Sequence, residues 1–160
     1  MVGASPFVRH HVFLLDTVAG NSAKVRHEDW RFTMTVPTPL FVVAVVDDDQ
    51  GILRSLEYLL ESADYAVRVF ASAAALLESN CLAEIDCLIS DIDMPGMDGF
   101  ELLRQVHWAR AQLPVIFITG YPDRLTRVPV LGGSKPRVFT KPFQGHELLE
   151  AVSEALRAFR

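Results

Sequence analysis

The 160-residue chain has few cysteines, no long apolar run and no excess of basic residues. Its two cysteines, Cys81 and Cys87, have neither a metal-site spacing nor a further pair, which suits a reduced cytosolic setting. No apolar run approaches the roughly 20 residues that span a bilayer, and no membrane partner is expected. Arg9, His10 and His11 interrupt the start of the chain, so a secretory signal is not expected either. These absences favour a cytoplasmic protein.

The charge balance is acidic, with a formal net charge of −5. A general nucleic-acid binder would need a basic patch, so direct DNA binding is not expected. Hydrophobic residues make up 50% of the chain and charged residues 22%, which is typical of a globular rather than a disordered protein. The length allows one domain with a real core but not two full ones.

Residues 1–39 differ from the rest of the sequence. They show no sustained period of 2 or 3.6, and they end in Val36-Pro37-Thr38-Pro39, which blocks regular structure. Met34 falls just before that stretch. We therefore expect a flexible N-terminal extension that lies partly upstream of a natural start at Met34. The competing interpretation is a short docking segment that uses Trp30, Phe32 and the Val12–Leu15 run.

From Leu40 onward, strand and helix periods alternate. The predicted strands are Phe41–Val46, Ala66–Phe70, Cys87–Asp91, Val115–Thr119 and Val138–Thr140. The predicted helices are Ile52–Ala63, Ala73–Glu78 with Ser72 as its N-cap, one capped by Asp98, and one that starts near Gly145. This alternation predicts a single α/β domain over residues 40–160. We expect a five-stranded parallel sheet, doubly wound, with right-handed crossovers and helices on both faces.

The segment between the last two strands departs from this pattern. Where a fourth helix belongs, the sequence has Pro122, Pro129, Gly132, Gly133 and Pro136. Proline inside a helix costs about 3 kcal/mol and glycine about 1 kcal/mol. We predict that this helix is short or irregular, spanning about Asp123–Val128, and that a loop follows it.

Polar side chains follow four of the predicted strands. Asp47 and Asp48 end the first, Asp91 the third, Thr119 the fourth and Lys141 the fifth. Ligands of parallel α/β sheets bind at this carboxyl edge. Two like charges 4 Å apart repel by about 4 kcal/mol at an effective dielectric of 20, so three clustered carboxylates need a cation or protons.

A hard cation that keeps some of its water, Mg²⁺, suits such a cluster. A carboxylate such as Asp91 is a known type of nucleophile toward a metal-bound phosphoryl group. Thr119 would donate a hydrogen bond to a phosphoryl oxygen, and Lys141 would neutralise another. The strand ends therefore predict a Mg²⁺-dependent phosphorylation site.

Four motifs in order resemble the receiver domain of two-component response regulators. They are Val46-Asp47-Asp48-Asp49, Asp91-Ile92-Asp93-Met94-Pro95-Gly96-Met97-Asp98-Gly99, Thr119-Gly120 and Lys141-Pro142-Phe143. The successive separations, 43 residues from Asp48 to Asp91, 28 from Asp91 to Thr119 and 22 from Thr119 to Lys141, suit that family. The resemblance covers about residues 41–160. It implies a flavodoxin-like receiver fold with strand order 2-1-3-4-5.

The resemblance also implies a role for each site residue. Asp91 would accept a phosphoryl group from a histidine kinase or histidine phosphotransferase. Asp47 and Asp48 would hold Mg²⁺ together with Asp91, and the backbone carbonyl of Asp93 would complete the protein ligands. Thr119 and Lys141 would sense the phosphate. The only reactions expected are self-phosphorylation and autodephosphorylation at Asp91, so the chain is not expected to be an enzyme in any other sense.

The sequence departs from the family at the output side. The position three residues before the lysine, which is usually aromatic and turns inward in the switch, is Val138, and Phe139 follows it. The chain looks like a stand-alone receiver whose output is docking to an unknown downstream protein, or phosphate relay. We expect a monomer or a weak homodimer.

Two other functions compete with this one. A phosphohydrolase of the haloacid dehalogenase type would share Asp91-Ile92-Asp93, Thr119 and Lys141, but in that family an acidic pair follows the lysine instead of preceding the nucleophile. A receiver-like module that binds a partner constitutively would have no reason to keep three clustered acids.

Several neighbouring residues have structural interpretations. Asp49 is expected to take no part in metal binding, His107 and His146 to lie at the surface or rim, and Trp108 and Phe143 to pack.

Overall fold

The structure is a computed structural model that describes residues 41–130 and 135–159. The predictions for residues 1–39 lie outside the described residues. The elements, in chain order, are β1 (Val42–Val46), α1 (Gln50–Glu61), β2 (Ala66–Phe70), α2 (Ala73–Glu78), β3 (Cys87–Asp91), α3 (Gly99–Ala109), β4 (Val115–Thr119), the 3₁₀ helix η1 (Pro122–Arg127), β5 (Arg137–Thr140) and α4 (Gly145–Phe159). No helix in these described ranges is long and apolar enough to cross a bilayer.

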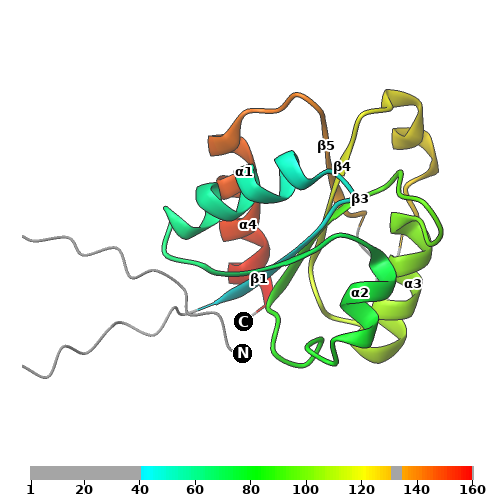
Figure 1. The fold of residues 1–160 in the computed structure, drawn as a ribbon, viewed down its shortest axis with the longest axis horizontal. Helices are drawn as coiled ribbons and strands as arrows, with labels where there is room; N and C mark the ends of the chain where they lie inside the picture. Colours follow the sequence, from blue (N-terminus) through cyan, green and yellow to red (C-terminus); the bar gives the residue numbers. More distant parts are fainter. Residues whose placement is uncertain (1–40, 131–134, 160) are drawn as a thin grey trace, which may run out of the picture. The chain divides into compact units, whose positions relative to one another are not determined.

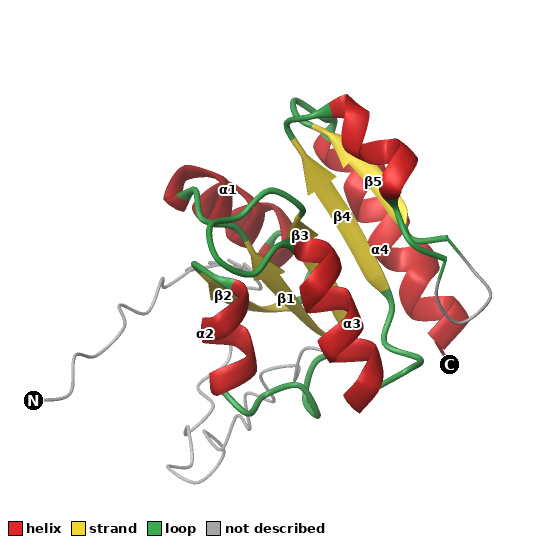
Figure 2. Cartoon of the chain, turned by 90° about the vertical axis from the view of Figure 1, so that its right-hand side faces the viewer, coloured by secondary structure: helices red, strands yellow, loops and turns green. Residues whose placement is uncertain are grey.

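The strands form one parallel sheet in the order β2-β1-β3-β4-β5. Helices α1 and α4 cover one face, and α2 and α3 cover the other (Figures 1 and 2). This arrangement confirms the predicted fold class and strand order. Because all the strands run the same way, the residues that follow β1, β3, β4 and β5 meet at one edge of the sheet.

Each face of the sheet has its own core cluster, because side chains alternate along a strand. Leu76, Leu103 and Phe117 are buried between the sheet and the pair α2 and α3. Ile118 and Val152 are buried on the α1 and α4 side. Strands β3 and β4 are buried on both faces, so their sequences are almost continuously apolar. Burying each large apolar side chain contributes about 1.5–3 kcal/mol.

Short polar side chains fix where the helices start. Asp49 Oδ1 accepts hydrogen bonds from the N–H groups of Gly51 (2.7 Å) and Ile52 (3.1 Å), which caps α1. Helix α1 therefore starts two residues before the predicted boundary. Ser72 caps α2 and Asp98 caps α3, as predicted.

The irregular segment after β4 matches its prediction. In the part that the structure describes, it forms the six-residue 3₁₀ helix η1, which has no fully buried side chain and no side-chain N-cap. Residues 131–134 of the predicted loop lie outside the described residues. Val128, just beyond it, is buried against the α2 and α3 core. The six residues of η1 therefore add little apolar packing to this core.

Glycine is required at position 99, the first residue of α3, because the backbone there lies very close to the backbone of Asp91 and Ile92. A Cβ atom there would overlap the carbonyl oxygen of Asp91 and lie 2.9 Å from Cα of Ile92. Both neighbours are main-chain atoms of the segment that carries the candidate site. Gly120, by contrast, has open space around its Cβ position.

We predict that Gly99→Ala lowers the free energy of unfolding by about 1–3 kcal/mol, the usual cost of overpacking. Gly120→Ala is the matched control and is expected to unfold like the wild type. Urea unfolding followed by far-UV circular dichroism measures both. Equal midpoints for the two variants would contradict the packing argument.

Candidate functional site

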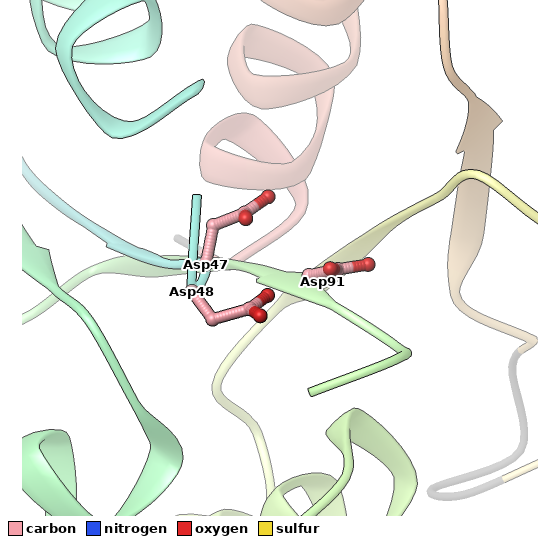
Figure 3. Close-up of side chains that lie close together, drawn as sticks. All are labelled: Asp47, Asp48 and Asp91. Carbon is pink, nitrogen blue, oxygen red and sulfur yellow. The ribbon is translucent and has the colours of Figure 1, made fainter. Parts of the chain in front are cut away.

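Three carboxylates converge at the carboxyl ends of β1 and β3. Asp47 and Asp48 follow β1, and Asp91 is the last residue of β3. Each offers a carboxylate oxygen, and these three oxygens lie within 4.8 Å of one another (Figure 3). Asp47 is fully buried, Asp91 is 5% exposed and Asp48 faces solvent. The structure thus brings together the three acids that the sequence predicted.

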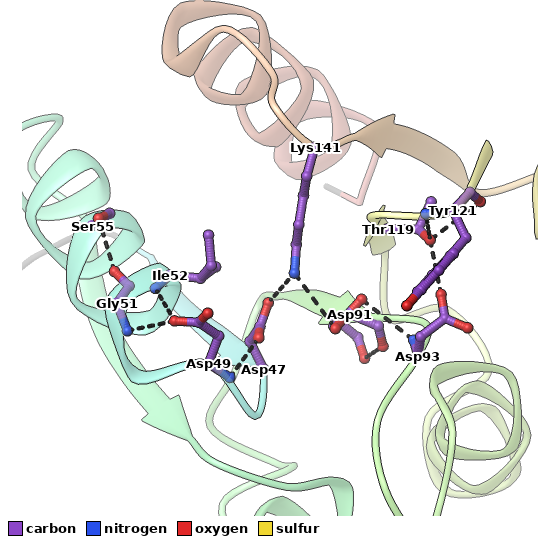
Figure 4. Close-up of polar contacts among 11 residues, drawn as sticks. Asp47, Asp49, Gly51, Ile52, Ser55, Asp91, Asp93, Thr119, Tyr121 and Lys141 are labelled. Carbon is purple, nitrogen blue, oxygen red and sulfur yellow. Dashed lines mark hydrogen bonds and ion pairs between the residues drawn. The ribbon is translucent and has the colours of Figure 1, made fainter.

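The ammonium of Lys141, which follows β5, lies between two of these acids. Its Nζ atom is 2.7 Å from Asp47 Oδ2 and 3.5 Å from Asp91 Oδ2 (Figure 4). The other oxygen of Asp47 accepts a hydrogen bond from the backbone N–H of Asp49, at 2.8 Å. The buried carboxylate of Asp47 therefore has a close partner on each oxygen. The contacts of Asp91 are longer: the ammonium lies 3.5 Å from Oδ2, and the backbone N–H of Asp93 donates to Oδ1 at 3.3 Å.

The pKa values reflect this difference. Burial raises the pKa of Asp91 above its ordinary value; the charge of Lys141 opposes the rise, and the charge of Asp47 adds to it. Burial alone would lower the pKa of Lys141, but its hydrogen bond and ion pair with Asp47, helped by Asp91, raise it overall. Asp91 is thus an acid whose ionised form is held at a cost, and Lys141 stays protonated.

The donor set fits a magnesium ion. Three carboxylate oxygens within reach of one another are hard ligands, and one of the three acids opens to solvent. A single ammonium does not balance three carboxylates, so a divalent cation would complete the charge. Asp47, Asp48 and Asp91 would hold it. The predicted contribution of the Asp93 backbone carbonyl stays a prediction.

Thr119, at the end of β4, is fully buried, and its hydroxyl makes two hydrogen bonds of 3.0 Å or less. Oγ1 donates to Asp93 Oδ2 at 2.9 Å and accepts from the backbone N–H of Tyr121 at 3.0 Å (Figure 4). The other carboxylate oxygen of Asp93 pairs with Nε of Arg124 at 2.8 Å. The side chain of Asp93 therefore binds Thr119 and Arg124 rather than joining the three clustered acids.

The contact of Arg124 with Asp93 is a feature that sequence reasoning missed. Arg124 belongs to η1, the segment predicted only as irregular, and it is part of none of the four motifs. Periodic spacing predicts where a side chain points only in a regular helix or strand, so it could not predict the position of Arg124. The acid at Asp93, two residues after Asp91, was the available signal for a cationic partner.

The structure settles the predictions for the neighbouring side chains. His146 is exposed, and half-buried His107 places Nε2 3.1 Å from the carbonyl oxygen of Leu113, so both lie at the surface or rim as predicted. Phe143 packs as predicted, with its ring centroid 5.9 Å from that of Phe139. The prediction for Trp108 is wrong, because this side chain is 93% exposed.

Position 138, which is usually aromatic in receiver domains, is a valine here, and the neighbouring Phe139 does not replace it. Val138 is partly buried against the core of the α2 and α3 face, whereas Phe139 packs on the α1 and α4 face. The two neighbours point to opposite sides of β5, as successive strand residues must. Phe139 therefore does not occupy the place of the missing aromatic side chain.

A family profile and curated relatives both assign this chain to the response regulators. The profile of the response regulator receiver domain matches residues 43–153. Response regulator protein TodT of Pseudomonas putida is 36% identical over 116 residues, which are 72% of this chain and 51% of TodT. Transcriptional regulatory protein FixJ of Bradyrhizobium diazoefficiens is 32% identical over 115 residues, 72% of this chain and 56% of FixJ. The chain thus spans about half the length of these curated relatives.

Solved structures give the same result. A CheY-like response regulator receiver domain protein from Methanospirillum hungatei JF-1 superposes with a TM-score of 0.67 at 31% identity, covering 75% of this chain and 96% of that one. The signal receiver domain of an HD domain-containing protein from Pseudomonas fluorescens Pf-5 gives 0.66 at 32% identity, with coverages of 74% and 95%. These matches favour the receiver interpretation over a haloacid dehalogenase.

The raised pKa of Asp91 predicts how the stability of the metal-free protein depends on pH. The unfolded chain releases this proton near the ordinary value of 3.8, and the folded chain releases it only at higher pH. Between those values the unfolded state binds fewer protons at Asp91, so the contribution of this residue to the stability of the wild type falls as pH rises and is then constant. We expect Asp91→Asn to become more stable than the wild type across this window and to keep that advantage at neutral pH.

Urea unfolding in EDTA from about pH 3.5 to pH 7 measures this difference. The control is Asp64→Asn, an exposed site with φ of 63° that asparagine also accepts. It removes the same charge far from the cluster, so no comparable advantage should develop. An Asp91→Asn protein less stable than the wild type at pH 7 would show that Asp91 gains more from Lys141 than burial costs it.

Proposed function

Because the chain belongs to the response regulator receiver domain family, we propose that Asp91 accepts a phosphoryl group from a histidine kinase or histidine phosphotransferase. The observation that supports this most is the position of Asp91. Its carboxylate ends β3 beside two further acids, and its one cationic partner, Lys141, is 3.5 Å away. The Asp47 carboxylate, by contrast, is 2.7 Å from the same ammonium, and the Asp93 carboxylate is bound by Thr119 and Arg124.

In the proposed reaction, one carboxylate oxygen of Asp91 attacks the phosphorus atom of the donor. The bond from phosphorus to the histidine nitrogen of the donor breaks as the acyl phosphate bond forms, and the nitrogen keeps the electron pair. A bound Mg²⁺ would offset the negative charge that Asp91 and the phosphoryl oxygens bring together. Asp47 and Asp48, with the carbonyl of Asp93, would hold this ion against Asp91.

Lys141 and Thr119 have separate tasks in this proposal. The ammonium of Lys141 is already between Asp47 and Asp91, so it would neutralise one phosphoryl oxygen without a large movement. The hydroxyl of Thr119 would donate a hydrogen bond to another. Water attacking the same phosphorus would later return Asp91 to its free form. No other catalytic activity is proposed.

The output is proposed to be a protein contact in the cytoplasm that changes on phosphorylation, made by a monomer or weak homodimer. FixJ is named as a transcriptional regulator, and this chain spans about half of it. The absence of direct DNA binding therefore stays a prediction, based on the acidic charge of −5. The identities of the kinase and the downstream protein are separate questions.

Intact-protein mass spectrometry after incubation with acetyl phosphate and Mg²⁺ tests the proposal. We expect the wild type to gain one phosphoryl group, and Asp91→Asn and the EDTA control to gain none. Asp98→Asn is the matched acid control, because Asn also caps a helix, and it should be modified like the wild type.

Two results would contradict the proposal. One is a modification that persists in Asp91→Asn, which would place the phosphoryl group elsewhere. The other is a wild type that stays unmodified both with acetyl phosphate and with phosphorylated histidine kinase. That second result would favour a receiver-like module that binds its partner constitutively.

A further inference from the structure

The hydroxyl of Thr119 has one proton, and in this structure that proton is used by Asp93. Oγ1 lies 2.9 Å from Asp93 Oδ2, and the alternative acceptor, the carbonyl oxygen of Tyr121, is 3.4 Å away. The same hydroxyl would have to donate to a phosphoryl group on Asp91. It cannot donate one proton to both, so phosphate sensing requires that the bond to Asp93 break.

The carboxylate of Asp93 is held in place from two sides. Arg124 Nε pairs with Oδ1 at 2.8 Å, and Thr119 binds Oδ2. The backbone N–H of Asp93 also donates to Asp91 Oδ1 at 3.3 Å. The carboxylate side chain is 16% exposed, which makes these charge-assisted contacts stronger than those of a fully solvated pair. A change at Asp91 therefore reaches Asp93 directly.

From this geometry we propose that Arg124 is a positioning residue: by holding Asp93, it keeps the Thr119 hydroxyl away from Asp91 in the unphosphorylated state. This inference rests on the proposed function. We call Thr119, Asp93 and Arg124 the polar latch. It connects the end of β4 to η1, so the state of Asp91 would be transmitted to the segment Pro122–Arg127.

The charges explain why phosphorylation would open the polar latch. A phosphoryl group adds about −1.5 to −2 charges and several acceptor oxygens beside Asp93. The new charge repels the carboxylate of Asp93 and offers the Thr119 hydroxyl a stronger acceptor. Arg124 opposes this change by stabilising the Asp93 carboxylate where it is. Removing Arg124 should then favour the phosphorylated arrangement instead of weakening it.

Because η1 is short and irregular, the ion pair of Arg124 with Asp93 can influence the position of this segment. None of the six side chains of η1 is fully buried and only Leu125 is a half-buried apolar one, so apolar packing holds the segment weakly. Val138 offers no aromatic ring that could follow Thr119 inward. Besides the hydrogen bonds of the Thr119 hydroxyl to the backbone of Tyr121, the described side-chain link between Thr119 and η1 runs through Asp93 and Arg124.

The first experiment measures the polar latch without any phosphoryl group. Tyr121 donates its N–H to Thr119 Oγ1 at 3.0 Å, so hydrogen exchange of this amide reports whether the hydroxyl is held. We expect Arg124→Gln to accelerate exchange of the Tyr121 amide by about 3- to 10-fold, the range for a part-buried charged pair. Asp93→Asn should act in the same direction.

The control is Arg127→Gln, which removes the same charge from an exposed position on the same short segment. Exchange at Tyr121 should match the wild type in this variant. Equal exchange rates in Arg124→Gln and Arg127→Gln would overturn the proposal, because the ion pair would then not hold Thr119. NMR of the amides of β3 and β4 checks that each variant is folded.

The second experiment uses beryllium fluoride with Mg²⁺, a tetrahedral stand-in for the phosphoryl group on a carboxylate. We expect Arg124→Gln to bind it about 3- to 10-fold more tightly than the wild type, since less is lost when Thr119 moves. A general structural defect would weaken binding, so a gain is the distinguishing readout. Unchanged or weaker binding by Arg124→Gln would overturn the proposal, the latter pointing to Arg124 as a phosphate ligand.

The two experiments separate the polar latch from the proposed function. A wild type that binds no beryllium fluoride would contradict the phosphoacceptor role of Asp91. Hydrogen exchange at Tyr121 would still decide whether Arg124 holds Asp93 and Thr119 in place.

Discussion

The ammonium of Lys141 is the contact on which the candidate site depends. It lies between the carboxylates of Asp47 and Asp91, which end two neighbouring strands, and it comes from beyond a third. Asp47 is fully buried, and removing one partner of a buried pair typically costs about 3–5 kcal/mol. The cluster of three carboxylates nevertheless has one ammonium among its described ion pairs, and that ammonium contacts two of them. The folded domain therefore keeps an unbalanced negative charge at the edge where a phosphoryl donor and its metal would arrive.

The rest of the site follows from parallel strands that end in polar residues. Strands β3 and β4 were predicted from sequence with the bounds that the structure has, because each is an apolar run closed by Asp91 or Thr119. The predicted meeting of Asp47, Asp48 and Asp91 is confirmed for the same reason. Because β1 and β3 are parallel neighbours, the residues at their carboxyl ends must lie at the same edge of the sheet.

What sequence reasoning missed depends on side-chain direction and on irregular backbone. Trp108 was expected to pack, but it lies two residues beyond buried Val106, a turn of about 200° around a helix, and so faces solvent. The early start of α1 depends on Asp49 accepting two backbone N–H groups, a role hidden among three consecutive acids. The pairing of Arg124 with Asp93 depends on the path of η1, which no periodicity specifies.

The central claim is that Asp47, Asp48 and Asp91 form a cation site that the charge of Lys141 leaves incomplete. Isothermal titration calorimetry of Mg²⁺ into the wild type and into Asp48→Asn tests it most directly, because Asp48 is exposed and its loss should spare the fold. The account predicts one site in the wild type and binding at least tenfold weaker in Asp48→Asn, about 1.4 kcal/mol. Equal affinities, or no binding by the wild type, would contradict it.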